Sequence, residues 1–101
     1  MTSMHQPRIQ CRVVGGEKLP ASVGGAAALC AAIERAAAAS PTLHFSVVVK
    51  VLGQSRLSAS LTTADGKILP EQKYAISDRS LDKPAIDRFA SSLIQAALAG
   101  R

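Results

Sequence analysis

The feature of this chain that most constrains its fold is an alternation of apolar and polar side chains between residues 43 and 63. Leu43–Leu52 is apolar at every odd position, and Arg56–Thr63 is apolar at positions 57, 59 and 61. Successive side chains of a strand point to opposite faces, so this period of two predicts two strands with one apolar face each. A three-residue loop, 53–55, pairs Val51 with Leu57 and keeps both apolar sets on one face, whereas a loop of two residues would invert one strand.

A further strand is predicted at Lys67–Ile76, after the dipeptide Asp65-Gly66. This dipeptide is typical of a two-residue type I′ hairpin turn, in which both central residues need a positive φ. Such a turn sets Leu57 opposite Tyr74, and because cross-strand partners share a face, Ile68 and Tyr74 are expected to point inward.

Two segments carry apolar side chains at helical spacing. Ser22–Ala39 opens with Ser22, whose hydroxyl is a good N-cap, and Asp82–Ala99 opens with Asp82 as N-cap and Pro84 in its first turn. The apolar stripes are Ala26, Leu29, Cys30, Ile33 and Ala37 in the first helix, and Ile86, Phe89, Ala90, Leu93, Ala97 and Leu98 in the second.

The resulting order of elements is β-α-β-β-β-α. The first strand, Arg8–Val14, reaches the strand at 43–52 through a helical crossover, so the two are expected to run parallel. Pro70 lacks a backbone N–H, which places its strand at a sheet edge. Because each strand has one apolar face, both helices are expected on that face. We therefore predict an α+β two-layer sandwich with a four-stranded mixed sheet in one domain, 1–101, of which residues 1–7 are expected to be disordered.

Composition and charge narrow the classes of function. The 101 residues carry a net charge of +5, which favours a nucleic acid or another anionic partner. The cationic residues are scattered without a run of like charge, as on a solvated surface. No apolar leader follows Met1–Pro7, and no segment reaches the roughly 18 apolar residues of a membrane span. The chain as written is expected to be cytoplasmic, or periplasmic if a leader peptide was removed.

The two cysteines are both expected on the inward side, Cys11 on the first strand and Cys30 on the first helix. In an oxidising compartment they would form a disulfide between the two layers, and in the cytosol they would be buried thiols. The absence of a visible leader favours thiols. Two cysteines and two distant histidines do not form a zinc site, and no metal or cofactor is predicted.

Two glycine pairs, Gly15-Gly16 and Gly24-Gly25, bracket the loop before the first helix. Their spacing matches neither the dinucleotide-binding pattern nor the P-loop, so we interpret them as turn glycines that also permit close packing.

His44 is the one histidine within a predicted element, and it opens the second strand on its polar face. Ser46 and Ser58 are expected near it, but no nucleophile elbow or activating carboxylate accompanies them. The chain is therefore expected not to be an enzyme.

The sheet face without helices is the candidate partner surface. It is polar apart from Val48 and has none of the aromatic side chains on which RNA-binding sheets stack bases. Residues 43–99, three strands and a helix, superficially match the last four elements of the α-β-β-β-α order of the double-stranded RNA-binding domain. The second helix of that domain opens with a lysine cluster, whereas here the helix offers only Lys83 and Arg88, interspersed with Asp82 and Asp87. A protein partner is favoured, and nucleic acid is the alternative. The predicted surface residues are Arg12, Lys50, Arg56, Ser58, Ser60 and Lys73.

Residues 56–100, RLSASLTTADGKILPEQKYAISDRSLDKPAIDRFASSLIQAALAG, resemble small accessory lipoproteins of the Gram-negative envelope. The shared pattern is a strand, an Asp-Gly turn, a strand with a tyrosine, and an alanine-rich closing helix. The first half, a strand and an Ala/Leu helix, is also similar to that group, although the lipid-bearing cysteine near the start is missing. The resemblance implies an α/β sandwich with two helices on one sheet face, and an adaptor that binds protein partners without catalysis. Apart from the resemblance, a homo-oligomer is a second expectation for the partner.

Overall fold

The structure, a computed structural model, describes residues 9–40, 43–77 and 80–99 of the chain. The order β-α-β-β-β-α is confirmed, with two short 3-10 turns between the first strand and the first helix. The predicted disorder of residues 1–7 lies outside the described residues. The elements are β1 (Ile9–Val14), η1 (Gly16–Lys18), η2 (Ala21–Val23), α1 (Gly25–Ala37), β2 (Phe45–Gly53), β3 (Arg56–Thr63), β4 (Gln72–Ala75) and α2 (Lys83–Ala99).

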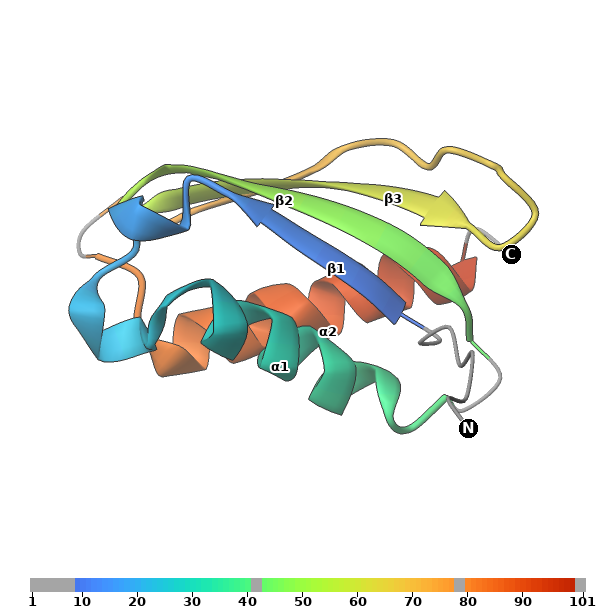
Figure 1. The fold of residues 1–101 in the computed structure, drawn as a ribbon, viewed down its shortest axis with the longest axis horizontal. Helices are drawn as coiled ribbons and strands as arrows, with labels where there is room; N and C mark the ends of the chain where they lie inside the picture. Colours follow the sequence, from blue (N-terminus) through green and yellow to red (C-terminus); the bar gives the residue numbers. More distant parts are fainter. Residues whose placement is uncertain (1–8, 41–42, 78–79, 100–101) are drawn as a thin grey trace, which may run out of the picture.

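The four strands form one mixed sheet in the order β1-β2-β3-β4. β1 runs parallel to β2, and the other two pairs are antiparallel. Both helices lie on the same side of this sheet, and the other side carries no helix (Figure 1). The predicted two-layer α+β sandwich is therefore confirmed, including the edge position of β4.

The predicted register of β2 and β3 is confirmed, but the predicted loop 53–55 is not, because Gly53 still belongs to β2 and pairs with Arg56, which leaves a two-residue loop, 54–55. Val51 pairs with Leu57, and Val47 pairs with Leu61. All four side chains are buried, as expected for the face that the helices cover. The ladder shifts by one residue between Val51 and Gly53, so Leu52 is the extra residue of a β-bulge.

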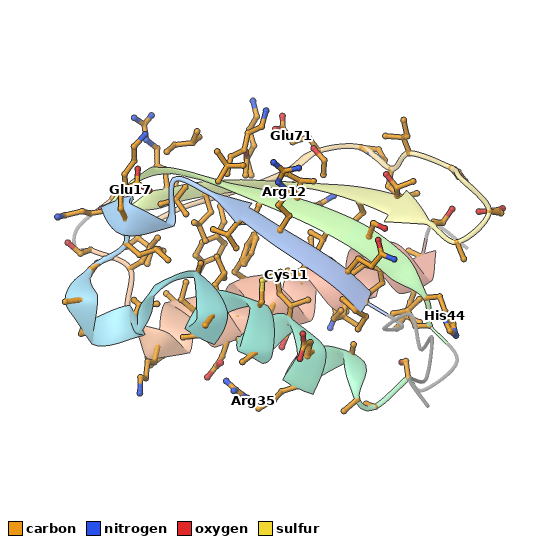
Figure 2. All side chains as sticks on the ribbon, viewed as in Figure 1. Cys11, Arg12, Glu17, Arg35, His44 and Glu71 are labelled. Atoms are coloured by element: carbon orange, nitrogen blue, oxygen red, sulfur yellow. A yellow bond between two sulfur atoms is a disulfide. The ribbon has the colours of Figure 1, made fainter. Side chains whose placement is uncertain are left out.

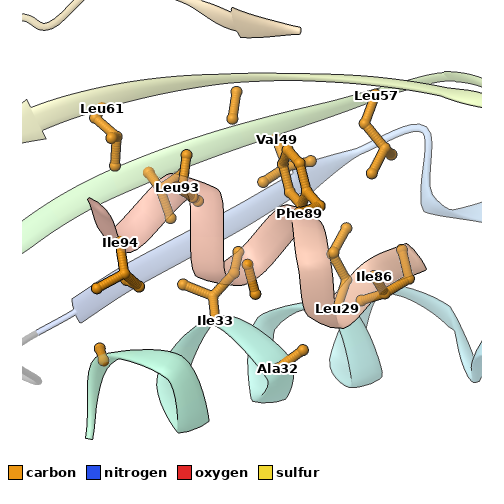
Figure 3. Close-up of a cluster of buried hydrophobic side chains, with 14 of the residues drawn as sticks. Leu29, Ala32, Ile33, Val49, Leu57, Leu61, Ile86, Phe89, Leu93 and Ile94 are labelled. Carbon is orange, nitrogen blue, oxygen red and sulfur yellow. The ribbon is translucent and has the colours of Figure 1, made fainter. Parts of the chain in front are cut away.

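The buried apolar side chains form one core between the sheet and the two helices. Figure 3 shows Leu29 and Ile33 of α1 and Phe89 and Leu93 of α2 facing the strands. Alanines on both helices, such as Ala32, allow close approach. Among the described helices, none combines the length and the apolar character required to cross a bilayer.

The turn between β3 and β4 differs from the prediction. Gly66 has a φ of +91°, but Asp65 does not have a positive φ, so the turn is not of type I′. The N–H of Gly66 donates to the carbonyl of Thr63 at 2.9 Å, and the N–H of Thr63 donates to the carbonyl of Lys67 at 2.8 Å. These bonds close a three-residue loop, 64–66, ending in a left-handed glycine.

The longer loop changes which side chains are buried at the start of the returning segment. Ile68 bridges Thr62 and is 75% exposed, whereas Leu69 is only 6% exposed. The predicted inward position of Ile68 was therefore wrong, because a slip of one residue exchanges the two faces. The predicted register returns further on, where Tyr74 pairs with Leu57. The strand predicted over Lys67–Ile76 is therefore shorter in the structure, where β4 covers only Gln72–Ala75.

The helix starts are a second difference. α1 begins at Gly25, and Ser22 lies in η2, so Ser22 is not the N-cap. The N-cap is Gly24, whose φ of +97° is a left-handed conformation that suits glycine. α2 begins as predicted, because the Asp82 carboxylate accepts the N–H of Ala85 at 2.9 Å.

Glycine is also required where β1 ends. Gly15 has a φ of +78°, and a Cβ built there would lie 2.8 Å from the carbonyl oxygen of Val51. The interpretation of the glycine pairs as turn and packing residues is confirmed at Gly15 and Gly24, because the backbone conformation and close approach account for them.

Cys11 of β1 and Cys30 of α1 form a disulfide, with their Cα atoms 5.8 Å apart. In this structure the pair takes the disulfide alternative, contrary to the preference for two thiols. The inward face of β1 and the apolar stripe of α1 bring the two side chains together. The preference for thiols was based on the leader peptide alone and did not consider this geometry. The bond ties α1 to the edge strand of the sheet.

Candidate functional site on the open sheet face

The side of the sheet turned away from the helices forms a continuous surface of side chains. Figure 2 shows Arg12 projecting on this side, whereas Cys11 points between the sheet and the helices. We call this surface the open face. Its described residues are Gln10, Arg12, Val14, Ser46, Val48, Lys50, Leu52, Arg56, Ser58, Ser60, Thr62, Ile68, Lys73 and Ala75.

Three of the predicted surface residues stand side by side across the strands. Lys50 of β2 is opposite Ser58 of β3, which is opposite Lys73 of β4. The two lysines are exposed, but Ser58 is only 3% exposed and is not an accessible surface residue as predicted. It lies on an inner strand between two long side chains, whose aliphatic stems shield a short hydroxymethyl group.

The other three predicted residues occupy neighbouring rows of the open face. Arg12 is opposite Val48, which in turn is opposite the half-buried Ser60. Arg56 begins β3 and is opposite Ala75 of β4. The sheet therefore brings all six residues onto one face, as the alternation predicts.

Apolar residues also belong to the open face, although the alternation predicted only Val48 there. Among the described residues, the exposed large apolar side chains are Val14, Val48, Leu52 and Ile68, with exposed fractions of 47%, 36%, 51% and 75%. All four are on the open face. The even positions of Val14 and Leu52 within their strands are a signal for this placement, whereas Ile68 depends on the turn before it.

The four cations of the open face, Arg12, Lys50, Arg56 and Lys73, have no salt bridge and no side-chain hydrogen bond with another described residue. The ion pair that the described residues do form, Arg35–Asp87 at 3.4 Å, joins the two helices away from the open face. The four charges are therefore available to a ligand.

A depression of about 290 Å³ lies at one corner of the open face, beside β4. Its apolar wall is bordered by two of the free cations. The residues that line it are Leu52, Arg56, Leu57, Lys73, Tyr74 and Ala75.

The expected grouping of His44 with the two serines is only partly present. Ser46 follows two residues later, in β2, and its hydroxyl donates to the Gln10 side-chain oxygen at 3.5 Å. Ser58 is opposite Lys50 of β2, whereas His44 lies just before β2, six residues earlier in the chain, or roughly 20 Å away at the rise of a strand. Ser58 is therefore not near His44, contrary to expectation.

His44 instead lines a separate, mainly apolar cavity of about 280 Å³ at the opposite end of the sheet, together with Thr63 and Asp65. The Thr63 hydroxyl donates to the Asp65 carboxylate and so lowers the pKa of that carboxyl below its ordinary value. The same hydroxyl accepts the N–H of Lys67 at 3.0 Å. These bonds hold Thr63 and Asp65 in the hairpin turn. Their position beside His44 is therefore accounted for by the turn.

Comparison of the chain with models of protein families, with curated proteins and with solved structures finds no match. The function is therefore argued from the open face of this chain.

Proposed function

We propose that the domain is a non-enzymatic protein-binding module, an adaptor that holds its partner on the open face. The observation that carries this proposal is the exposure of four large apolar side chains on the one sheet face that no helix covers. The solvated face of an antiparallel sheet is normally polar. Apolar side chains gathered on such a face, with charged neighbours around them, are typical of a protein interaction surface.

The net charge of +5 and the four free cations support nucleic acid as a second candidate. The positions of the aromatic residues disfavour it. Phe45 and Phe89 are buried in the core, and the Tyr74 ring packs against Phe89 with ring centroids 5.9 Å apart. The sequence has no other Phe, Tyr or Trp, so the described residues of the open face offer no such ring on which bases stack.

The resemblance to small envelope lipoproteins favours an adaptor of the Gram-negative cell envelope. The Cys11–Cys30 disulfide supports this location, because disulfides persist in oxidising compartments such as the periplasm. We therefore propose the periplasm as the compartment in which the module binds its partner.

Affinity capture from a lysate of the source organism tests the function. The bait proteins are the wild type, the open-face variant R56E/K73E, and a matched control, K83E/R88E, whose two exposed residues lie on α2. Both variants change the net charge equally. We expect a partner protein that the wild type and the control capture and that the open-face variant loses. Identical bound proteins for all three baits would contradict the proposal.

A further inference from the structure

The open face alternates cationic and apolar side chains in two dimensions. Across the β1–β2 pair, Arg12 is opposite Val48, and Val14 is opposite Lys50. Along β2, Lys50 stands between Val48 and Leu52, each two residues away. Every apolar side chain of this central area therefore has a cation as its immediate neighbour.

The corner depression repeats the same combination. Its lining combines the cations Arg56 and Lys73 with four less polar residues, Leu52, Leu57, Tyr74 and Ala75. A group that fills this depression meets aliphatic carbon and positive charge at once.

None of the four described strands contains an aspartate or a glutamate. Figure 2 shows Glu71, on the chain leading into β4, on the same side of the sheet as Arg12. Among the described residues, no carboxylate pairs with any of the four cations of the open face. Desolvating four unpaired cations in an interface is costly unless the ligand supplies negative charge to them.

We infer that the partner presents an acidic segment in which carboxylates alternate with aliphatic side chains; this inference rests on the proposed function. The carboxylates bind Arg12, Lys50, Arg56 and Lys73 through charge-assisted hydrogen bonds. The aliphatic side chains cover the apolar residues between these cations, and one of them fills the corner depression. The partner segment thus forms ionic and apolar contacts side by side on the open face.

Two other classes of anionic ligand fit this arrangement less well. A nucleic-acid backbone supplies phosphates but no aliphatic groups for the valines and leucine. A bilayer separates its anionic headgroups and its hydrocarbon by depth, whereas the cations and the apolar side chains of the open face lie in one layer. A peptide carries both kinds of group at the spacing of neighbouring residues.

The test uses a short fluorescein-labelled peptide in which Glu and Leu alternate. Two matched peptides replace every Glu by Gln or every Leu by Ser, and a single-stranded oligonucleotide and vesicles containing phosphatidylserine complete the panel. Fluorescence anisotropy measures binding of the peptides and the oligonucleotide, and sedimentation measures binding to vesicles. We expect the Glu/Leu peptide to bind the wild type most tightly, and each matched peptide to lose about tenfold in affinity or more.

The variants locate the binding. R56E/K73E and the apolar variant V48S/L52S should each weaken the Glu/Leu peptide about tenfold or more, while K83E/R88E should leave its affinity within about twofold. Circular dichroism confirms that each variant is folded. The inference is overturned if the peptide does not bind, if the Gln peptide binds equally well, or if the oligonucleotide or the vesicles bind the open face in its place.

The two proposals fail separately in these experiments. A captured partner that depends on the open face, combined with no binding of the acidic peptide, overturns the inference and leaves the proposed function standing. Capture that is indifferent to R56E/K73E overturns the function itself.

Discussion

Removing the Cys11–Cys30 disulfide should lower the free energy of unfolding by about 3 kcal/mol. The two cysteines are 19 positions apart, so the bond closes a loop of about 20 residues. In the chain-entropy description, opening a loop of this length restores unfolded-state entropy worth about 3 kcal/mol at 25 °C. That is a large fraction of the roughly 5–15 kcal/mol by which small domains are stable.

Urea unfolding followed by far-UV circular dichroism measures this change. The variant C11A/C30A is compared with the wild type, each with and without dithiothreitol. With a urea dependence of about 1–2 kcal/mol per molar, the unfolding midpoint should fall by about 1.5–3 M in the variant and in the reduced wild type. The variant itself should not respond to dithiothreitol. A reduced wild type that unfolds at the same urea concentration as the oxidised protein would refute the reasoning.

Three further predictions concern the turns and the pH response. G15A should cost about 1–2 kcal/mol of unfolding free energy, because a positive φ and a carbonyl 2.8 Å from the new Cβ both oppose it; G53A, with open space around it and no positive φ, should change stability by less than about 0.5 kcal/mol in the same urea titration. L69A should cost about 2–3 kcal/mol and I68A less than about 0.5 kcal/mol, since Leu69 is buried and Ile68 is exposed; the reverse ranking would indicate the two-residue turn. The pKa of Asp65 is lower in the folded state, so its ionised carboxylate stabilises the fold at a pH above the unfolded pKa near 3.9, and this stability is lost as the pH falls through the folded pKa. D65N should therefore make the urea midpoint fall less steeply at acidic pH. An unchanged fall at acidic pH would exclude this contribution.

The hairpin of β2 and β3 could be predicted from the sequence because its register is fixed by many side chains at once. A slip of one residue would have moved Val47 and Leu61, together with every other apolar partner, from the core into water. The faces of the helices were predictable for the same reason, because each is defined by several apolar residues at constant spacing.

The turn at Asp65-Gly66 could not be predicted in the same way, because its sequence suits two loops of different length. Both loops place Gly66 at a positive φ, and they differ in whether Asp65 does so. The side chain of Thr63, which bonds Asp65 and Lys67, accompanies the longer loop. Such short-range hydrogen bonds do not appear in an apolar–polar pattern.

The sequence predicted the charged residues of the candidate site, but it predicted only one of the site's exposed apolar residues. Alternation placed Arg12, Lys50 and Lys73 on the open face, and the structure agrees. The burial of Ser58 required knowledge of both neighbours on adjacent strands, and the exposure of Ile68 required the loop length. These are consequences of tertiary pairing, which local patterns do not specify.

The most direct measurement of whether the open face is uncovered in solution is its accessibility to a soluble paramagnetic probe. Methyl NMR signals of a dilute, isotopically labelled sample are recorded with and without a neutral gadolinium chelate. The methyl groups of Val14, Val48 and Leu52 should broaden strongly, and those of Val47 and Leu61 should remain sharp. Equal protection of both sets would mean that the open face is already covered, and would contradict its role as a free partner surface.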